Sequence, residues 1–451
     1  MCVFAQVTEV EVAYIEFPSI TICNLQPISM STANSLLLNS STEFFRWNNT
    51  TKYFFHELES VTNDTHTYEL WYDRMRGPRG FFENIGDESR IVGHQSSDFI
   101  LGCTFGKELC GAENFSYFQS PSFFNCYTFN GGNMQADKLM ARATGPEAGL
   151  SLVLYLESDN GDMRYDGPYY TYLNVGNSAG VRVTIHAPDT RPSPIDFGFD
   201  VPPGFSSSTG INVLQYERLG APYGKCKTED PPTVKSQFVY SAHACLMACQ
   251  QEYIYSSCGC LSSLLPVPLK MNGKLYCGYF NESDPTRVFQ NSDCEADRMT
   301  EFANNEGLRS LCICDAPCIE STYRTDLSYA YWPIDFAQEE FYRKYVLKNS
   351  KRDQLKAYQN LKGFNFSEIV HQGLVRKNFI RLNVYLKSLI IEETVQKGSY
   401  TFFNLFSDIG GTFGLWIGMS VLTWGEVFEL STHLLLRWIK KLRRERYELN
   451  G

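Results

Sequence analysis

The sequence predicts an α+β membrane protein whose large extracellular part is rich in disulfides, and three observations predict this class. The chain carries 15 cysteines, ten of them between Cys226 and Cys318. Triplets that accept N-linked glycans begin at Asn39, Asn48, Asn49, Asn63, Asn114, Asn281 and Asn365. Cysteines and glycan acceptors together indicate an oxidising, extracellular compartment. The third observation is an apolar stretch, residues 400–422, in which Asp408 is the only charged residue.

The composition argues against several functions. A net charge of −10, with no basic patch outside the last fifteen residues, argues against nucleic acid as a partner. The seven histidines are scattered, and neither H-E-x-x-H nor G-x-S-x-G occurs, so we expect no enzyme, no cofactor and no metal site. Cys258-Gly-Cys260 and Cys312-Ile-Cys314 have a spacing that zinc tolerates, but a glycosylated ectodomain favours disulfides.

The chain alternates between strand-like and irregular segments. Residues 13–25 read as a strand, and residues 31–125 are irregular, aromatic and glycan-rich. Three stretches alternate apolar and polar residues, as half-buried strands do: SLVLYLE, VRVTIHA and IRLNVYLK, which begin at Ser151, Val181 and Ile380. We expect a loop over the proline-rich residues 188–203 and surface helices over residues 335–362.

Cys245 and Cys249 are four residues apart in a helical pattern, so both side chains face the same neighbouring element.

A basic cluster after the apolar stretch indicates the orientation of the chain. It contains Arg437, Lys440, Lys441, Arg443, Arg444 and Arg446. Such a cluster just past a span marks the cytoplasmic side, so the cysteine-rich part is expected outside the cell and the C-terminus inside. The apolar start, MCVFAQV, is too short for a signal sequence or a span. We therefore expect a targeting or membrane segment before Met1.

The polar and glycine residues of the last segment, which are unfavourable within a membrane, fall on one face of a helix. The face contains Asp408, Gly411, Leu415, Gly418, Leu422, Glu426 and Glu429. On an unbroken helix Asp408 and Glu426 lie about 27 Å apart at about 1.5 Å per residue, close to the roughly 30 Å of a hydrocarbon core. Carboxylates in a span face water or a bundle interior, so several such helices form a cation pore. A single-pass anchor that dimerises through its glycines is the alternative.

Four segments carry a resemblance to a known family. FPSITICN, FNCYTFN, the block from Cys226 to Cys318 and SDIGGTFGLWIGMSVLT resemble the epithelial sodium channel, degenerin and acid-sensing ion channel superfamily. The likeness runs from about Val3 to about Glu429, and the chain is most similar in character to the FMRFamide-gated sodium channels within that superfamily. It implies a trimer with a disulfide-rich β-sheet palm and ball, a helical finger, knuckle and thumb, and transmembrane helices, the first of them largely absent from this sequence.

The resemblance also implies a division of the chain into domains. Residues 1–12 correspond to the outer end of the first transmembrane helix and the wrist, 13–30 to a palm strand, 31–125 to the finger, 126–225 to palm and β-ball, 226–320 to the disulfide-stapled thumb, 321–398 to the palm return with knuckle helices, 399–440 to the second, pore-forming transmembrane helix, and 441–451 to a cytosolic tail.

Individual residues take roles from the same resemblance. Gly418, Met419 and Ser420 match the G-x-S selectivity filter, Ser407 the gate, and Phe4 and Tyr223 the coupling through the wrist. We expect a strand that ends near Leu389 to continue this coupling into the pore helix. Asp408, Gly411, Leu415, Leu422, Glu426 and Glu429 are expected to line the pore. The implied disulfides are Cys23–Cys126, Cys103–Cys110, Cys226–Cys318, Cys245–Cys314, Cys249–Cys312, Cys258–Cys294 and Cys260–Cys277. Ala5 and Gln6 stand where acid-sensing channels carry paired histidines, which argues against acid gating.

The function that follows is a trimeric, sodium-selective channel of the plasma membrane, blocked by amiloride-like molecules. Its expected partners are identical or related subunits, membrane lipid and a short extracellular peptide agonist of the FMRFamide type; Na⁺ is the permeant ion. Trp71, Phe82 and Asp87 are expected to bind the peptide, since a cationic peptide with aromatic side chains needs aromatic walls and a carboxylate. Alternatives are a constitutive, proton-gated or mechanically gated channel of the same superfamily, and a single-pass adhesion or receptor ectodomain without a pore.

Overall fold

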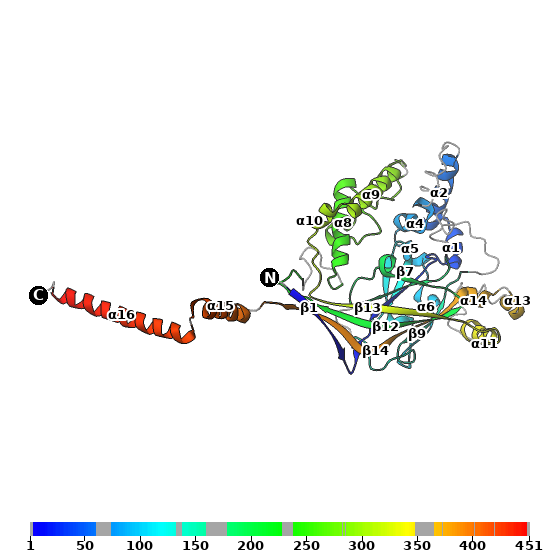
Figure 1. Ribbon diagram of the computed structural model, residues 1–451. Coiled ribbons are helices and arrows are strands. Elements are labelled where there is room, and N and C mark those ends of the chain that lie inside the picture. Colours follow the sequence, from blue (N-terminus) through cyan, green and yellow to red (C-terminus); the bar gives the residue numbers. More distant parts are fainter. Residues whose placement is uncertain are drawn as a thin grey trace.

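The computed structural model describes residues 3–59, 74–131, 138–158, 178–227, 238–281, 283–284, 286–347, 365–371, 373–400, 402–418 and 420–448. Two layers of β-sheet form the body of the protein, and helices cover one side of it (Figure 1). The last two helices, α15 (Phe402–Ile417) and α16 (Val421–Glu448), extend away from this body.

The larger sheet has seven strands in the order β13-β12-β14-β9-β4-β5, with β1 also pairing with β14. Their bounds are Val3–Glu11 for β1, Ile100–Phe105 for β4, Glu108–Cys110 for β5, Leu150–Tyr155 for β9, Phe205–Glu217 for β12, Ile319–Tyr331 for β13 and Phe379–Gly398 for β14. β14 is 20 residues long, which corresponds to about 66 Å of extended chain. It pairs in turn with β9 and with β1, so one strand links the core of the body to the start of α15.

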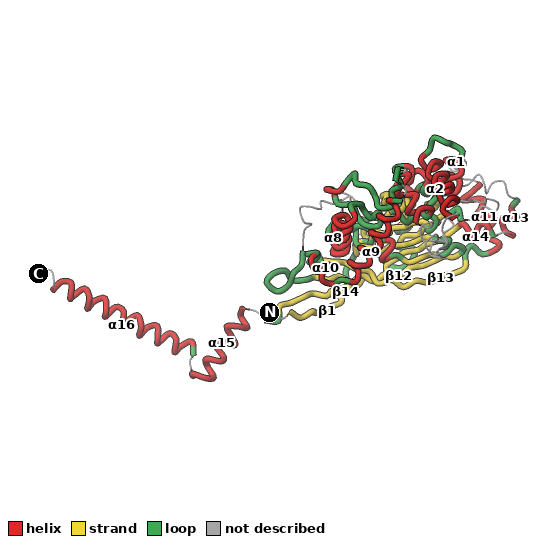
Figure 2. The backbone as a smooth tube through the Cα atoms, turned by 90° about the horizontal axis from the view of Figure 1, so that it is seen from above, coloured by secondary structure: helices red, strands yellow, loops and turns green. Residues whose placement is uncertain are grey.

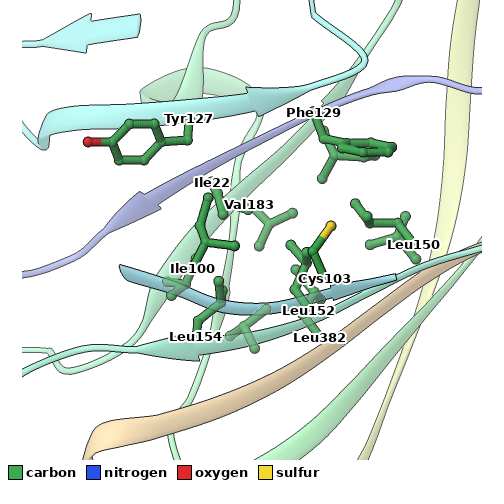
Figure 3. Close-up of a cluster of buried hydrophobic side chains, with 14 of the residues drawn as sticks. Ile22, Ile100, Cys103, Tyr127, Phe129, Leu150, Leu152, Leu154, Val183 and Leu382 are labelled. Atoms are coloured by element: carbon green, nitrogen blue, oxygen red, sulfur yellow. The ribbon is translucent and has the colours of Figure 1, made fainter. Parts of the chain in front are cut away.

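The smaller sheet has the strand order β11-β10-β3-β7-β6. Its strands are β3 (Ser19–Asn24), β6 (Phe115–Ser120), β7 (Phe124–Phe129), β10 (Val181–His186) and β11 (Phe199–Val201), and a separate pair joins β2 (Ile15–Glu16) to β8 (Met140–Ala141). The two sheets enclose the main core, where Ile22 and Val183 of one sheet lie near Leu152 and Leu382 of the other (Figure 3). The expected alternation is present in the larger sheet, since Leu152, Leu154, Leu382 and Leu386 are buried.

A helical lobe covers the sheets at the end away from both termini (Figure 1). It comprises α1 (Met30–Leu37), α2 (Glu43–Glu59), α4 (Pro78–Ile85), α5 (Glu88–Val92) and α6 (Ser96–Phe99). α1 begins at Ser29, whose side chain accepts a hydrogen bond from the Thr32 N–H, as expected of an N-cap. Phe44, Trp47, Phe81 and Phe124 form its separate hydrophobic cluster. Much of the region expected to be irregular is therefore helical.

A second helical group stands beside the helical lobe. It consists of α8 (Ala242–Cys258), α9 (Arg287–Asn304) and α10 (Glu306–Leu311), and we refer to α8 and α9 as the stapled helices. The disulfides of the described residues are Cys23–Cys126, Cys103–Cys110, Cys226–Cys318, Cys245–Cys314, Cys249–Cys312, Cys258–Cys294 and Cys260–Cys277. These are the pairs that the resemblance implied. Five of them lie in or at the base of the stapled helices, where the local core contains few apolar residues.

Shorter elements complete the fold. They are α7 (Pro194–Phe197), α11 (Gln338–Tyr342), α13 (Phe366–His371), α14 (Leu374–Asn378), and short helical turns over Ala112–Asn114, Leu269–Met271, Asp335–Ala337 and Arg343–Leu347. The expected loop over residues 188–203 is wrong in part, because α7 and β11 lie within it. The expected surface helices over 335–362 are also wrong in part, since Tyr342 and Val346 are buried in a third cluster. The rest of that range, from residue 348 on, lies outside the described residues.

The first segment differs from its expected helix. Residues 3–11 form β1, which pairs antiparallel with the far half of β14. Valine and threonine favour strands, and β14 supplies the hydrogen-bonding edge that a local sequence pattern does not reveal. Met1 and Cys2 lie outside the described residues.

Candidate functional site

The helix expected over residues 399–440 is broken within the G-x-S motif. α15 ends at Ile417 and α16 begins at Val421. Gly418 between them has a φ of +66°, a left-handed conformation that glycine adopts without steric cost. Ser420 caps the N-terminus of α16. Its Oγ accepts a hydrogen bond from the Thr423 N–H at 3.3 Å, and its carbonyl accepts one from the Trp424 N–H at 3.1 Å.

The break corrects the expectation of one continuous helical stripe. Asp408, Gly411 and Leu415 lie on α15, whereas Leu422, Glu426 and Glu429 lie on α16. The distance of about 27 Å assumed an unbroken helix and does not apply. The last carbonyls of a helix have no intrahelical partner, so the end of α15 presents carbonyl oxygens near Gly418. Met419 lies outside the described residues.

Both terminal helices expose apolar side chains in this single chain. Phe403, Leu405, Phe406, Ile409, Phe413, Leu415, Trp416, Leu422, Trp424, Val427, Phe428 and Leu430 are among the exposed ones. Figure 2 shows that α15 and α16 project from the body at the end where β1 and β14 lie. Among the described helices, none combines the length and the apolar character needed to cross a membrane.

The expected gate and the first carboxylate lie together on α15. Ser407 is exposed, and Asp408 follows it. The Asp408 carboxylate accepts a hydrogen bond of 2.5 Å from the hydroxyl of Tyr400, which precedes the helix. Asp408 is therefore held toward the entrance of α15, on the side of the sheet. Glu426 and Glu429 are exposed on α16, beyond the break.

Both expected wrist residues meet the end of β14. Phe4 of β1 pairs with Lys397, next to Gly398. The Tyr223 ring lies against Gly398 so closely that a methyl group there would be 2.8 Å from the ring carbon Cε1. The Leu219 N–H also donates to the Gln396 side chain at 3.1 Å. The loop after β12 thus contacts β14 directly before α15.

The strand was expected to end near Leu389, and this is wrong, because Leu389 lies within β14, which continues to Gly398. Its carbonyl accepts a hydrogen bond from the Val12 N–H at 3.0 Å, and its side chain packs against the main core. Nine residues separate it from Gly398, which is about 30 Å along a strand. Leu389 marks the point where β14 leaves the core and begins to pair with β1.

The loop that carries Tyr223 is fastened to the base of the stapled helices. Arg218 forms an ion pair of 2.7 Å with Glu320 and donates to the Pro317 carbonyl at 2.9 Å. The Cys226–Cys318 disulfide and a 3.0 Å hydrogen bond from the Lys227 N–H to the Ala316 carbonyl hold the same region. A displacement of residues 316–320 therefore moves the loop that touches Gly398.

Two of the three expected peptide-binding residues, Phe82 and Asp87, lie within the described residues. Phe82 of α4 packs against Phe124 and Tyr276, with ring centroids 6.1 Å from each. Asp87 is exposed just before α5, and Trp71 lies outside the described residues. Phe82 therefore contributes to packing, whereas Asp87 is free to meet a ligand from solvent.

A buried charge cluster between the helical lobe and α9 was not anticipated from the sequence. It contains Arg74, Arg79, Glu83 and Glu295, which we refer to as the seam cluster. Arg74 contacts Glu83 at 2.7 Å and Glu295 at 3.6 Å, and Arg79 contacts both carboxylates. The spacing of Arg79 and Glu83 suggests an i,i+4 pair, but no local pattern reveals the contact with Glu295.

Two histidines lie away from the terminal helices: His94 is buried and His186 is half-buried. Burial lowers the pKa of His94 and of His186 to about 4. The His186 ring also contacts the hydroxyls of Thr21 at 2.9 Å and Thr190 at 3.0 Å. These two histidines stay neutral in mild acid.

The glycan acceptors differ in their surroundings. Asn39, Asn114, Asn281 and Asn365 are exposed, as a glycan requires. Asn48 and Asn49 lie half-buried within α2, and the Asn48 side chain accepts a hydrogen bond from Arg76 at 3.3 Å. Asn63 lies outside the described residues. The geometry favours modification at the four exposed asparagines.

Comparison with known proteins places most of the chain in one family. The family model described as "Amiloride-sensitive sodium channel" matches residues 3–430. The FMRFamide-activated amiloride-sensitive sodium channel of Cornu aspersum is 34% identical over 93% of this chain and 72% of its own length. The epithelial sodium channel subunit alpha of Neoceratodus forsteri is 30% identical over 84% of this chain and 52% of its own length.

A more distant relative is degenerin unc-8 of Caenorhabditis elegans, 29% identical over 76% of this chain. The chain spans only 39% of that protein and about half of the alpha subunit.

Proposed function

The chain belongs to the amiloride-sensitive sodium channel family, and from that premise we propose that it is a subunit of a trimeric, sodium-selective plasma-membrane channel opened by a short amidated peptide and blocked by amiloride-like molecules. Members of this family are plasma-membrane channels with a large extracellular domain. The body of sheets and disulfides corresponds in this proposal to that domain. The proposed role is transport and not catalysis.

The break at Gly418 is the observation that carries the pore. A left-handed glycine between two helices leaves carbonyl oxygens at the end of α15 without helical partners. Three such ends around an axis supply a ring of neutral oxygens, and the Ser420 hydroxyl lies next to them. Oxygens of this kind replace the water shell of a cation in selectivity filters. Glu426 and Glu429, beyond the break, add negative charge that attracts cations.

Exposed apolar side chains on α15 and α16 support assembly in a membrane. Contiguous exposed apolar surface marks a site covered by another protein or by lipid. In this proposal, lipid and neighbouring subunits cover side chains such as Trp416, Trp424 and Phe428. Asp408 lies at the outer entrance and Ser407 at the gate.

Gating is proposed to travel through the wrist. A movement of the stapled helices acts on residues 316–320, then on the loop that carries Tyr223, then on Gly398 and α15. A peptide opens the pore only if it binds the open arrangement more tightly than the closed one. The relative from Cornu aspersum is named as FMRFamide-activated, which supports an amidated peptide as agonist. We retain Trp71, Phe82 and Asp87 as proposed contacts.

Proton gating has less support. Ala5 and Gln6 lie exposed on β1 and cannot titrate. Burial holds the pKa of His94 and His186 at about 4, below the range of mild acid. Constitutive or mechanical opening remains the second candidate within the family.

The test is whole-cell current from cells that express the chain, with perfusion of amidated peptides, their free-acid forms, pH steps and amiloride. We expect a sodium current with the amidated peptide and none with its free acid. Gly418→Ala is expected to abolish sodium selectivity, because alanine disfavours the left-handed conformation. Gly425→Ala, on α16 with no atom near its added methyl, is the matched control. Current without peptide contradicts peptide gating, and no current despite surface expression contradicts the channel.

A further inference from the structure

Two cavities meet at Arg191, between the smaller sheet and the stapled helices. The first has a volume of about 260 Å³ and is lined by Phe118, Pro194, Leu246 and Met247 among others. The second has a volume of about 390 Å³ and is lined by Tyr240, Val267, Leu311 and Ile313 among others. Arg191 and Ala244 line both cavities. A ligand in either cavity can therefore reach the Arg191 guanidinium.

The charge of Arg191 has no acidic partner among the residues that the structure describes. Its guanidinium carbon lies 5.3 Å from the centroid of the Phe118 ring, a cation–π contact that compensates only part of the lost hydration. Burial lowers the pKa of Arg191, with no acidic neighbour raising it. Arg191 is half-buried, so its guanidinium is partly removed from water without an acidic partner, and a bound anion recovers that part of the cost.

The surrounding charges favour a single negative charge at Arg191. α8 begins beside it, with Ser241 as its N-cap, and the N-terminus of a helix favours anions. Each cavity is lined by one carboxylate that is already paired: Asp196 of the smaller with His243 at 3.1 Å, and Glu252 of the larger with Lys270 at 2.7 Å. Because each carboxylate has its own cationic partner, the charge left to bind a ligand is that of Arg191, which matches one negative charge.

We propose that the double cavity at Arg191 binds a small amphipathic monocarboxylate. The carboxylate pairs with the Arg191 guanidinium, whose planar donors match two carboxylate oxygens. The apolar body of the ligand fills the larger cavity against Val267, Leu311 and Ile313. A volume of about 390 Å³ lies within the usual range for small-molecule sites.

Such a ligand contacts both the loop before α7 and the start of α8, so it holds the smaller sheet and the stapled helices together. The Tyr240 hydroxyl, at the wall of the larger cavity, donates to the Asp315 carbonyl at 2.7 Å. Asp315 precedes the segment that fastens the Tyr223 loop. A ligand in the cavity therefore affects residues 316–320, the segment that contacts the Tyr223 loop. The binding step itself does not depend on channel activity.

The test is isothermal titration of purified full-length protein with 4-phenylbutyrate, an apolar ring on a short chain with one carboxylate. We expect saturable binding that Arg191→Gln weakens by about tenfold or more, since a charge-assisted contact contributes at least that much. Arg142→Gln, an exposed arginine outside both cavities, is the matched control. The uncharged 4-phenylbutan-1-ol is expected to bind far more weakly.

A second variant keeps the proposal testable if Arg191→Gln does not fold. Val267→Trp fills the larger cavity while Arg191 stays in place, and it is expected to abolish binding of 4-phenylbutyrate. The proposal is overturned if the parent shows no saturable binding at millimolar concentration. It is equally overturned if Arg191→Gln or Val267→Trp binds like the parent, or if the alcohol binds as tightly as the acid.

Discussion

Glu295→Gln removes one of the two carboxylates of the seam cluster and leaves Arg74 and Arg79 with Glu83 alone. In the parent the two arginines and two glutamates balance. The side chains of Glu83 and Glu295 are 0% and 2% exposed, and those of Arg74 and Arg79 are 15% and 21% exposed. Water therefore cannot replace the lost carboxylate. The substitution leaves one uncompensated positive charge between the helical lobe and α9.

The expected cost follows from this burial. Removing one partner of a buried ion pair destabilises a protein by about 3–5 kcal/mol. Because a tenfold change in an equilibrium constant corresponds to about 1.4 kcal/mol, the seam is expected to open about 100-fold more often or more. Opening at the seam separates α4 from α9 without unfolding the sheets.

Hydrogen exchange of backbone amides measures this opening directly. We expect faster exchange in α9 and α4 of the purified full-length protein, with little change in β9 and β14. Glu301→Gln is the matched control, because Glu301 lies on the same helix in a partly exposed pair with Arg298, and a glutamine oxygen still accepts the 2.7 Å hydrogen bond from the Tyr253 hydroxyl. Exposed pairs contribute about 0–1 kcal/mol, so its exchange is expected to stay near that of the parent.

Two results contradict the reasoning. One is exchange in Glu295→Gln that stays within about tenfold of the parent, which corresponds to less than about 1.4 kcal/mol. The other is equally faster amide exchange in Glu301→Gln, which would mean that the loss of any carboxylate from α9 has the same effect. A double substitution, Arg79→Met with Glu295→Met, leaves one buried pair and is expected to recover much of the loss, because matched apolar side chains replace buried pairs at little cost.

Three further predictions concern the gate, the pore and the effect of pH. Ser407→Phe is expected to hold the pore open, because a bulky side chain prevents the pore helices of the proposed trimer from converging; a normal closed state of this variant, seen as no standing amiloride-sensitive current, removes Ser407 from the gate. Glu426→Gln is expected to lower sodium preference more than Asp408→Asn, since Glu426 lies on the side of the break away from the entrance; bi-ionic reversal potentials that shift only for Asp408→Asn reverse the assignment. The pKa of His186 is about 4 in the folded protein against about 6.5 when unfolded, so the unfolded state binds more protons and stability falls as pH drops from about 6.5 to about 4. His186→Gln is expected to remove up to about 3 kcal/mol of that loss; unfolding midpoints of parent and variant that change equally with pH contradict it.

Local patterns in the sequence predicted the sheets. Leu152, Leu154 and Leu382 are buried as their alternation requires, because successive side chains of a strand point to opposite faces. Asp408 and Gly418 were singled out from the cost of polar residues and glycine in an apolar stretch, whereas Ser420 came from the resemblance. The disulfide pairs came from resemblance, since ten clustered cysteines leave many pairings open.

Contacts between distant residues decided the rest. Val3–Glu11 became a strand because β14, nearly four hundred residues later, offers a free edge with which it pairs. The end of β14 was misplaced near Leu389 because the length of β14 depends on successive partners, β9 and then β1, and not on its own sequence.

Contacts between distant residues also decided which charged side chains pair. The seam cluster joins Arg79 to Glu295, 216 residues apart, and Arg191 meets its cavities only where the smaller sheet approaches α8. The sequence by itself determined which residues alternate and where polar groups interrupt the apolar stretch, because those are properties of neighbours along the chain. Only the tertiary structure decided which charges are buried together and which one lacks a partner among the described residues, because burial depends on segments that the chain brings together through folding.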